Sequence, residues 1–323
     1  MPTPIITLTH VSRTFNVKRH LIKAVDDVSL TIEEGEIVCL VGESGCGKTT
    51  TGKMIAGLLA PSAGTIAFRG QPINQMTRAD FRKYRLSVQM VHQDPYASLN
   101  PTHTIYDIIA APLRHHKFTR SDAETRARVR ELLTLVDLTP PDDFLDKFPH
   151  QLSGGQRQRV SIARALTVRP SFIVADEAVS MVDVSIRIGL LNLLTRFRDQ
   201  FGMSFLFITH DLALAKYFAW EGRIGVMYLG RLVELAPARD LVAHPQHPYT
   251  QVLLSAIPEA DPQVTRHKPR IELRSMDVPS LLRLPSGCAF HPRCPRFIGE
   301  VCERVVPELA QANNALVACH LIK

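Results

Sequence analysis

The sequence lacks any apolar run that approaches the roughly 20 residues needed to cross a bilayer. Its first residues, Met1 to Pro4, have neither the basic nor the long apolar portion of a signal peptide. Internal repeats and low-complexity tracts are also missing, so neither a repeat array nor a biased linker is indicated. We therefore expect a chain that stays in the cytosol and reaches a membrane only through a partner.

Aromatic residues are scarce at 7%, but 45% of the 323 residues are hydrophobic. That is enough for a sizeable core in one large domain or two unequal ones. The formal net charge of +7 can favour anionic lipid headgroups, nucleic acid or nucleotide phosphates. Such an excess is more often only a solvated surface, so the charge selects no partner.

Cysteine is rare through most of the chain and concentrated at its end. Two of the six cysteines, Cys39 and Cys46, lie in or beside a glycine-rich segment. The other four fall in about the last tenth: Cys288, Cys294, Cys302 and Cys319. In a reducing cytosol this cluster is more typical of a metal or iron–sulfur site than of disulfides.

Short apolar runs alternate with helical patterns along much of the chain. The run from Glu36 to Val41 precedes a glycine-rich turn, and Lys48 to Leu59 has helical spacing without proline. Phe172 to Ala175 and Ser204 to Ile208 also resemble buried strands, each followed by polar residues and a helix. This alternation predicts an α/β fold with a mostly parallel sheet covered by helices.

Three further segments differ in character. Residues from about Asp94 to Thr167 have helical patterns and few strand signals, which predicts a helical subdomain inserted in the core. Gly222 to Leu235 returns to short strand-like runs around Gly230. From about Pro245 prolines become frequent, so we expect a main domain over 1–245 and a loop-rich extension over 246–323 that is held by something other than a large core.

The glycine-rich turn is a phosphate-binding loop, and its strand and helix make a chance turn improbable. Its glycines let backbone N–H groups face the phosphates, and the following helix N-terminus adds positive charge. Lys48 is placed to reach the β- and γ-phosphates of ATP, and Thr49 to hold Mg²⁺. We also expect Cys46 to react readily with maleimides and to be protected by ATP. The predicted nucleotide-binding residues here are Gly42, Glu43, Ser44, Gly45, Cys46, Gly47, Lys48, Thr49 and Thr50.

Two carboxylates end the buried run at 172–175. Asp176 is placed to hold Mg²⁺ through water, and Glu177 to polarise the attacking water as general base. An isolated Asp-Glu pair is as often a solvated helix N-terminus. The upstream phosphate loop favours the catalytic interpretation.

The pentapeptide Leu152-Ser153-Gly154-Gly155-Gln156 is the most specific motif. In this order, after a phosphate loop and before Asp176-Glu177, it resembles the signature of the ABC ATPases. The resemblance implies an ABC ATPase fold with an antiparallel β subdomain and a helical signature subdomain. It also implies a head-to-tail dimer that sandwiches ATP between Lys48 of one subunit and Ser153 of the other, with Gly154, Gly155 and Gln156 also binding nucleotide.

The resemblance assigns roles to four more residues. Gln93 matches a glutamine that contacts Mg²⁺ and the attacking water, and His210 a histidine that senses the γ-phosphate. Phe15 lies where the family has an aromatic that stacks on adenine, and Asp183 where an aspartate crosses the dimer interface. Taken alone, Gln93 is a loop residue, His210 a capping residue and Phe15 a core residue.

One segment departs from the family. Ala178 to Val182 reads Ala-Val-Ser-Met-Val, where relatives usually have proline after the glutamate and Ala-Leu before the aspartate. This puts coupling between two ATP sites in doubt more than hydrolysis.

The C-terminal part carries a narrower resemblance. Val226 to Gly230, His247 to Thr250 and Gly287 to Pro295 look like the ATPase subunits of oligopeptide/dipeptide-type ABC importers. In those relatives the four cysteines bind a [4Fe–4S] cluster, although their spacing alone does not establish one. A Zn²⁺ site that includes His291 or His320, and unligated thiols, remain as alternatives.

The combined patterns indicate an ATP-hydrolysing subunit at the cytoplasmic face of the cell membrane. The implied partners are a second ATPase subunit, identical or sister, two transmembrane permease subunits and an extracytoplasmic solute-binding protein, with no nucleic acid. The surface from Gln93 to Pro101, with the helix from Thr104, is expected to dock the permease. Rival interpretations are a soluble ABC ATPase of DNA repair or translation, and a partner subunit that binds ATP without hydrolysing it. No coiled-coil insertion or second ATPase half supports the first, and the presence of Glu177 and His210 disfavours the second. The solute is left open among peptides, metals, glycosides and opines.

Overall fold

The computed structural model describes residues 4–17, 20–257 and 271–322. Its contacts divide the chain into two units, residues 1–75 with 207–323 and residues 76–206. Among the described residues, no helix is both long and apolar enough to cross a membrane.

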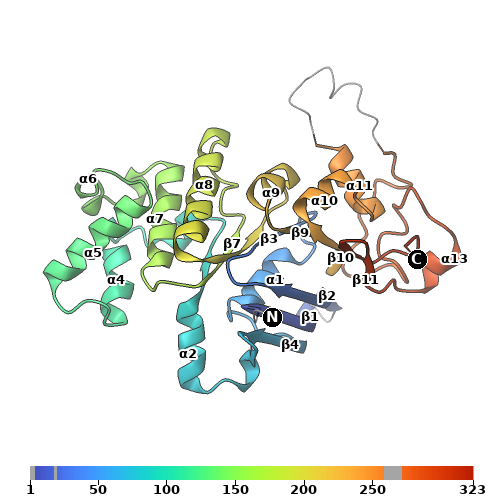
Figure 1. Cartoon of the computed structure of the whole chain (residues 1–323), viewed down its shortest axis with the longest axis horizontal. Helices are drawn as coiled ribbons and strands as arrows, with labels where there is room; N and C mark the ends of the chain where they lie inside the picture. Colours follow the sequence, from blue (N-terminus) through green and yellow to red (C-terminus); the bar gives the residue numbers. More distant parts are fainter. Residues whose placement is uncertain (1–3, 18–19, 258–270, 323) are drawn as a thin grey trace. The chain divides into compact units, whose positions relative to one another are not determined.

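Unit 1 contains a four-stranded antiparallel sheet in the order β2-β1-β4-β5, whose first strands lie side by side in Figure 1. Strands β1 and β2 pair along most of their length, and the buried Ile6, Leu8 and Ile32 form part of its core. The strands are β1 (Ile6–Val17), β2 (His20–Ile32), β4 (Ala63–Phe68) and β5 (Gln71–Pro72), followed by the 3₁₀ turn η1 (Ile73–Gln75).

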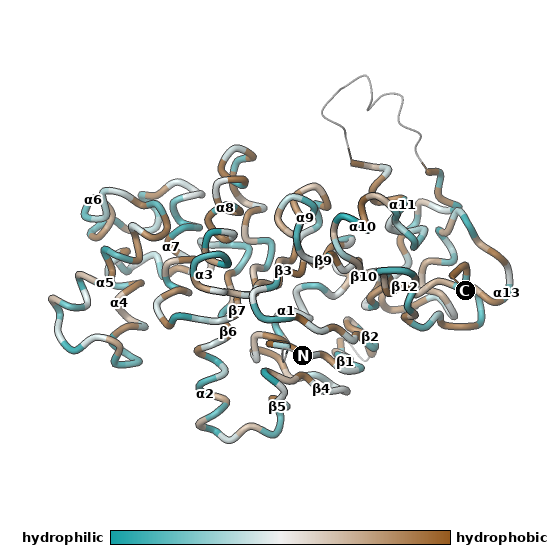
Figure 2. The backbone as a smooth tube through the Cα atoms, viewed as in Figure 1, coloured by the Kyte–Doolittle hydropathy of each residue, from teal (hydrophilic) through white to brown (hydrophobic). Residues whose placement is uncertain are grey.

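The second sheet of unit 1 has the order β11-β12-β10-β9-β3. Strand β3 pairs in parallel with β9, and all five residues of β3 are buried, as expected of a strand covered on both faces. Strand β9 is coloured as mostly hydrophobic in Figure 2. The strands are β3 (Ile37–Val41), β9 (Arg223–Tyr228), β10 (Arg231–Pro237), β11 (Ala310–Ala312) and β12 (Ala315–Val317).

A tight hairpin joins β9 to β10. Leu229 and Gly230 have φ angles of 43° and 87°, the paired left-handed conformation of a two-residue turn that suits twisted strands. The helices of unit 1 are short: α1 (Lys48–Ile55), α9 (Leu212–Phe218), α10 (Ala238–Ala243), α11 (Pro248–Ser255) and α13 (Glu300–Arg304). Helix α1 ends earlier than the predicted Leu59, because Gly57 turns left-handed with a φ of 64°.

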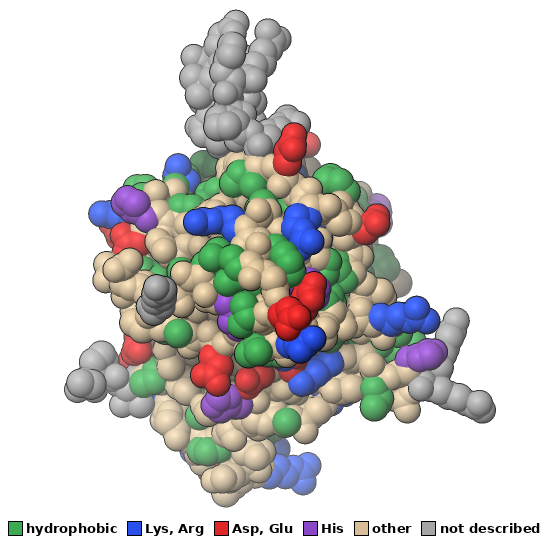
Figure 3. Space-filling view, turned by 90° about the vertical axis from the view of Figure 1, so that its right-hand side faces the viewer, with side chains coloured by type: hydrophobic (Ala, Val, Ile, Leu, Met, Phe, Trp, Pro, Cys, Tyr) green, Lys and Arg blue, Asp and Glu red, His purple; other side chains and the backbone are tan. Residues whose placement is uncertain are grey.

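The C-terminal extension, which is part of unit 1, packs on the rest of that unit through a small core of aromatic side chains. Phe290 is 1% exposed and its ring lies 5.2 Å from those of Tyr228 and Tyr249, and β12 pairs with β10. Other apolar side chains of the extension remain exposed, among them Met276, Val278, Leu282 and Val305. Figure 3 views this side of unit 1 and shows hydrophobic side chains among acidic and basic ones.

Unit 2 is mainly helical, with a parallel pair of strands, β6 and β7. Helices α4, α5 and α7 lie near one another in Figure 1 and bury Ile109, Val129, Leu132 and Val160. Its elements are α2 (Arg78–Ser87), β6 (Val88–Val91), α3 (Pro95–Ser98), α4 (Ile105–His115), α5 (Asp122–Leu135), α6 (Asp142–Leu145), η2 (Pro149–Gln151), α7 (Gly154–Leu166), β7 (Phe172–Asp176) and α8 (Val184–Phe201). Strand β8 (Ser204–Ile208) contains the boundary between the units.

Candidate functional site

The phosphate loop joins β3 to α1 in unit 1, and its backbone requires glycine at two positions. Gly42 and Gly47 have φ angles of 150° and 103°. A Cβ at Gly47 would lie 2.3 Å from the carbonyl oxygen of Ala24, and one at Gly42 would lie 2.2 Å from that of Met227. Because these neighbours are backbone atoms of adjacent strands, the loop is held in a tight curl that suits phosphate binding.

Lys48 begins α1 and points back into the loop. Its side chain is buried, and Nζ donates hydrogen bonds to the carbonyl oxygens of Gly42 at 2.7 Å and Glu43 at 2.9 Å. Thr49 and Thr50 follow, both half-buried. Nζ also lies 3.7 Å from Cys46 Sγ, so the ammonium is held by neutral groups of the loop and can be transferred to phosphate oxygens when nucleotide enters.

Two residues that the sequence analysis missed contact the same loop. Tyr249 Oη accepts a hydrogen bond from the Glu43 N–H at 3.1 Å, and Arg293 is ion-paired with the Glu43 carboxylate at 2.9 Å. They lie 206 and 250 residues beyond Glu43, and no local pattern in the sequence signals such a pairing.

The expectation that Cys46 is a reactive thiol is wrong. Its side chain is 3% exposed, and burial raises the pKa of the thiol despite the opposing effect of the Lys48 ammonium. A buried, protonated thiol is a poor nucleophile.

The two predicted catalytic carboxylates lie at the end of β7 in unit 2. Asp176 is buried, and Glu177 has a φ of 46°, an uncommon conformation for a residue other than glycine. Gln93 Nε2 donates a hydrogen bond to Glu177 Oε2 at 2.9 Å. The fold thus brings together a predicted general base and a predicted water-positioning amide from two separate loops.

The signature residues form the N-terminus of α7. Ser153 is the N-cap: its Oγ accepts the Gln156 N–H, and Gln156 Oε1 accepts the Ser153 N–H at 3.0 Å. Gly154 is half-buried, and a Cβ at Gly155 would lie 2.7 Å from Ile186 Cγ2, so glycine allows α7 to approach α8 closely. Because the Ser153 side chain is exposed, a phosphate oxygen can take its place as the acceptor of the N–H groups at the start of α7.

The segment that departs from the family is ordered by an arginine of α8. Arg187 Nε donates to the carbonyl of Val182 at 3.0 Å and Nη2 to that of Ser180 at 3.2 Å. Asp183 is exposed beside Met181 and Val184, whose side chains are 58% and 73% exposed. The unusual residues therefore form a loop held by Arg187, in which Met181 is the exposed apolar side chain.

His210 and Phe15 belong to unit 1. His210 is exposed, directly after β8, and its neighbour Asp211 caps α9 by accepting the Ala213 N–H at 2.9 Å. Phe15 is a half-buried residue of β1 with the Arg13 guanidinium 4.8 Å from its ring centroid. The roles expected of His210 and Phe15 at the nucleotide stay predictions.

The predicted iron–sulfur site is not supported by the geometry. Across residues 4–17, 20–257 and 271–322, no group of three or more His, Cys, Asp or Glu side chains is arranged to hold a metal ion. The four thiols nevertheless influence one another: the pKa of Cys288 is raised to about 11, mainly by burial and to a smaller extent by Cys319, Cys294 and Cys302.

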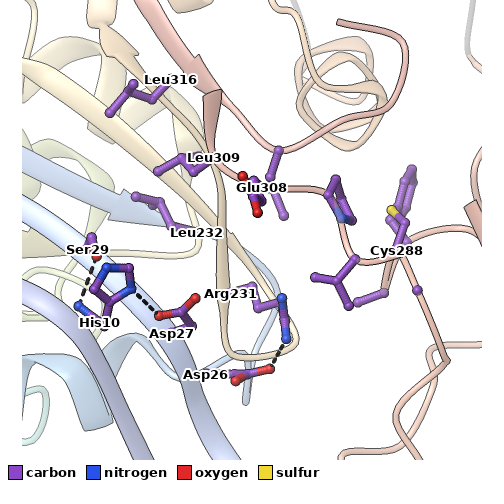
Figure 4. A pocket seen from close by; sticks show the side chains of 17 residues that line it. His10, Asp26, Asp27, Ser29, Arg231, Leu232, Cys288, Glu308, Leu309 and Leu316 are labelled. Carbon is purple, nitrogen blue, oxygen red and sulfur yellow. Dashed lines mark hydrogen bonds and ion pairs between the residues drawn. The ribbon is translucent and has the colours of Figure 1, made fainter. Parts of the chain in front are cut away.

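A cavity of about 550 Å³ lies elsewhere in unit 1, between β1, β2, β10 and the extension. Figure 4 shows two polar pairs at its edge, His10 with Asp27 and Arg231 with Asp26. Leu232, Leu309 and Leu316 supply its apolar wall. Because both aspartates are paired, we assign these residues a structural role in holding the strands at the cavity.

Comparisons with known proteins match nearly the whole chain. The family profile described as "ABC transporter" matches residues 25–180, and that described as "Oligopeptide/dipeptide transporter, C-terminal region" matches residues 233–302. The putative oligopeptide transport ATP-binding protein YkfD of Bacillus subtilis is 42% identical over 322 residues, covering 99% of this chain and 96% of the relative. The oligopeptide transport ATP-binding protein AppF of the same organism is also 42% identical, covering 98% and 97%.

A solved structure of the ATP-binding cassette MJ0796, a dimer bound to ADP and Pi, matches with a TM-score of 0.65 and 30% identity, covering 72% of this chain and 99% of that one. The structure of cbiO1 from Clostridium perfringens matches with a TM-score of 0.65 and 26% identity, covering 75% and 92%. The two family profiles and the two Bacillus subtilis relatives together match both the nucleotide-binding motifs and the C-terminal extension. The chain therefore belongs to the ABC transporter ATPases, in the branch with the oligopeptide/dipeptide transporter C-terminal region.

Proposed function

We propose that this ABC ATPase powers an importer for peptides or a related small solute. The observation that carries the hydrolytic part is the hydrogen bond between Gln93 and Glu177, which holds a carboxylate where a general base is needed. The transport part is supported by the match of residues 233–302 to the oligopeptide/dipeptide transporter C-terminal region.

The roles of individual residues are part of this proposal. Lys48 binds the β- and γ-phosphates, and Glu177 takes a proton from the attacking water. The residues fit Mg²⁺, because hydroxyl, carboxylate and amide oxygens suit it and Gln93 uses its nitrogen on Glu177, leaving its oxygen for a metal. Thr49, Asp176 and Gln93 would hold the ion. Mg²⁺, when bound, would neutralise part of the phosphate charge. His210 would contact the γ-phosphate, and Phe15 would stack on the adenine.

The active form would be a head-to-tail dimer with a second copy or a sister subunit. Three observations within unit 2 support this. Ser153 exposes its hydroxyl at a helix N-terminus, Met181 and Val184 expose apolar side chains, and Asp183 lies between them on the surface. Lys48 of one subunit and Ser153 of the other would then enclose ATP, with Asp183 crossing the interface.

The permease would dock on unit 2 near the Gln93 loop. A groove of about 500 Å³ is lined there by basic and apolar side chains, including Arg82, Arg85, His116 and Arg164. Arg164 also donates to the carbonyl of Ser98, so the groove adjoins the expected docking segment 93–101. We infer that the chain is held at the cytoplasmic face of the membrane by this contact with two permease subunits.

Two rivals are weaker. A soluble ABC ATPase of DNA repair or translation does not account for the match of the C-terminal region. A partner subunit that binds ATP without hydrolysing it does not account for Glu177 and its contact with Gln93.

For the extension, we propose that Cys288, Cys294, Cys302 and Cys319 share a [4Fe–4S] cluster, with Zn²⁺ as the alternative. Support comes from their mutual influence and from backbone N–H groups of Phe290, Arg296 and Leu321, each of which donates to the sulfur two residues earlier. Thiolates that accept N–H groups are typical of iron–sulfur ligands. Anaerobically purified protein should contain about four irons per chain and lose them in Cys294→Ser. One zinc per chain would exclude the cluster, and metal-free protein would exclude both.

The function is tested by isolating the complex. A pull-down from detergent extracts should recover two permease subunits and a solute-binding protein. In proteoliposomes, solute-loaded binding protein should stimulate ATP hydrolysis and drive uptake, and Glu177→Gln should abolish both. Recovery of DNA-repair or ribosomal proteins without a permease would overturn the proposal.

A further inference from the structure

Glu43, the second residue of the phosphate loop, is held by the C-terminal extension at both its backbone and its side chain. Its N–H donates to Tyr249 Oη at 3.1 Å. Its carboxylate accepts from Arg293 Nη1, at 2.9 Å to Oε1 and 3.0 Å to Oε2. The one acidic residue of a loop that must bind an anion is therefore held in an ion pair with an arginine from outside the loop.

Arg293 is itself firmly positioned. Its side chain is 7% exposed, and Nη1 also donates to Tyr228 Oη at 3.3 Å. The guanidinium carbon lies 5.9 Å from the ring centroid of Tyr228. Tyr228, Tyr249 and Phe290 pack on one another with ring centroids 4.7 to 5.2 Å apart, so this arginine emerges from an aromatic core rather than from a mobile surface.

Glu43 is also the residue on which the ATP-binding lysine rests. Lys48 Nζ donates to the Glu43 carbonyl at 2.9 Å and to that of Gly42 at 2.7 Å. The position of residue 43 therefore sets both the curl of the loop and the starting position of the ammonium. The loop carbonyls and the side chain of Glu43 connect Lys48 to Arg293 within a single unit.

We propose that Arg293 is a positioning residue through which the C-terminal extension holds the phosphate loop in its ATP-binding shape. The inference rests on the proposed ATPase function and goes beyond it, because it gives the extension a direct influence on nucleotide affinity. Without Arg293, the Glu43 carboxylate loses its cation and is free to turn toward the incoming phosphates. Both the looser loop and the nearby negative charge oppose ATP binding.

The expected effect falls on binding and not on turnover. Glu177 and Gln93, which are placed to activate water, belong to unit 2, whereas Arg293 and Glu43 belong to unit 1. Arg293→Met should therefore raise the KM for ATP about tenfold, the scale of one lost charge-assisted hydrogen bond, with kcat within about twofold. Arg293→Lys retains the charge, but its ammonium ends a differently shaped side chain and cannot keep the position of Nη1 between Glu43 and Tyr228, so its KM should be intermediate.

The test uses the full-length chain and two readouts. Affinity for a fluorescent ATP analogue is measured by equilibrium titration, and kcat and KM by steady-state hydrolysis. Arg274→Met is the matched control: Arg274 is an arginine of the extension whose guanidinium lies 4.0 Å from the Phe297 ring centroid, and among the described residues its side chain makes no hydrogen bond or ion pair with the phosphate loop. Thermal unfolding without nucleotide shows whether each variant is folded.

A double-mutant cycle separates positioning from general destabilisation. In Glu43→Gln the carboxylate charge is gone, so adding Arg293→Met should weaken ATP binding much less than it does in the wild type. The inference is overturned if a folded Arg293→Met binds ATP like the wild type or like Arg274→Met, if its kcat falls while KM is unchanged, or if the two effects are additive. A wild-type protein that binds but does not hydrolyse ATP would instead refute the proposed function, and the binding titration would still test the inference.

Discussion

Gly47 offers a test of why the phosphate loop has its shape. Its φ is 103°, and a Cβ there would lie 2.3 Å from the carbonyl oxygen of Ala24, in the neighbouring strand β2. Real Cβ atoms essentially never approach other atoms closer than 3.0 Å, so Gly47→Ala must displace backbone by more than half an ångström. Ala24 lies at a bulge of β2, and the residues on either side of it, Lys23 and Val25, pair with Thr14 and Arg13 of β1, so its carbonyl does not move freely.

The magnitude follows from two contributions. A left-handed backbone costs a residue other than glycine about 1–2 kcal/mol, and overpacking against an ordered neighbour costs about 1–3 kcal/mol. Gly47→Ala should therefore lower the free energy of unfolding by about 2–5 kcal/mol. Gly45→Ala is the matched control, since Gly45 has a φ of 80° but no atom within 4 Å of its Cβ position. It should cost only the first contribution, about 1–2 kcal/mol.

Urea unfolding followed by circular dichroism measures both variants under one condition, and titration with ATP measures their affinity. We expect Gly47→Ala to be less stable than Gly45→Ala by about 1–3 kcal/mol and to bind ATP more weakly. Equal stability of the two variants would refute the claim that the backbone of β2 imposes glycine at residue 47.

Three further predictions concern the buried groups of unit 1. Phe290→Ala should lower the free energy of unfolding by about 3–5 kcal/mol and expose the extension to proteolysis. Phe201→Ala is the control: this side chain is 56% exposed, so its loss should change the free energy of unfolding by less than about 0.5 kcal/mol. Similar losses in the two variants would contradict a packed core in the extension. Maleimide mapped by mass spectrometry should label Cys46 only after unfolding, and rapid labelling of the native protein would contradict its burial. Burial lowers the pKa of His247 from 6.5 to about 3, so the folded state stays neutral while the unfolded state gains a proton. Stability should therefore fall as pH drops below 6.5, by about 1.4 kcal/mol per unit down to about pH 3. His247→Asn replaces the capping Nδ1 with an amide oxygen that does not titrate, so it should flatten this dependence; parallel curves would contradict it.

Patterns of neighbouring residues predicted the bounds of the buried strands well. The apolar runs at 36–41, 172–175 and 204–208 correspond to β3, β7 and β8 within one residue. Ser153 and Gln156, three residues apart, form a capping box at the start of α7. These features depend on residues a few positions apart, which a sequence displays directly.

Contacts between residues that are far apart in the sequence could not be predicted from such patterns. The Gln93–Glu177 bond joins residues 84 apart; the sequence pattern indicated Glu177, but Gln93 was suggested only through the family resemblance. Arg293 lies 250 residues from Glu43, inside a run whose cysteines drew the functional interpretation. Cys46 was misjudged because a helix N-terminus lowers a thiol pKa only where the thiol is accessible, and neighbouring strands bury this one.

The extension also differs from what its composition predicted. Frequent proline and little helical pattern indicated a segment without much core. Instead Phe290 fills a pocket between two tyrosines contributed by β9 and α11, and β12 continues the sheet beside β10. One well-placed aromatic residue and a three-residue strand anchor the segment, and neither is evident from periodicity.

The steady-state rate of ATP hydrolysis by Glu177→Gln tests the central claim most directly. The substitution removes the carboxylate base but retains a side-chain oxygen that can accept the Gln93 hydrogen bond. The account predicts a loss of about 10²- to 10⁴-fold in kcat with ATP affinity unchanged, and accumulation of an ATP-bound dimer in size-exclusion chromatography with Mg-ATP. Hydrolysis at the wild-type rate would contradict it and remove Glu177 from the catalytic role.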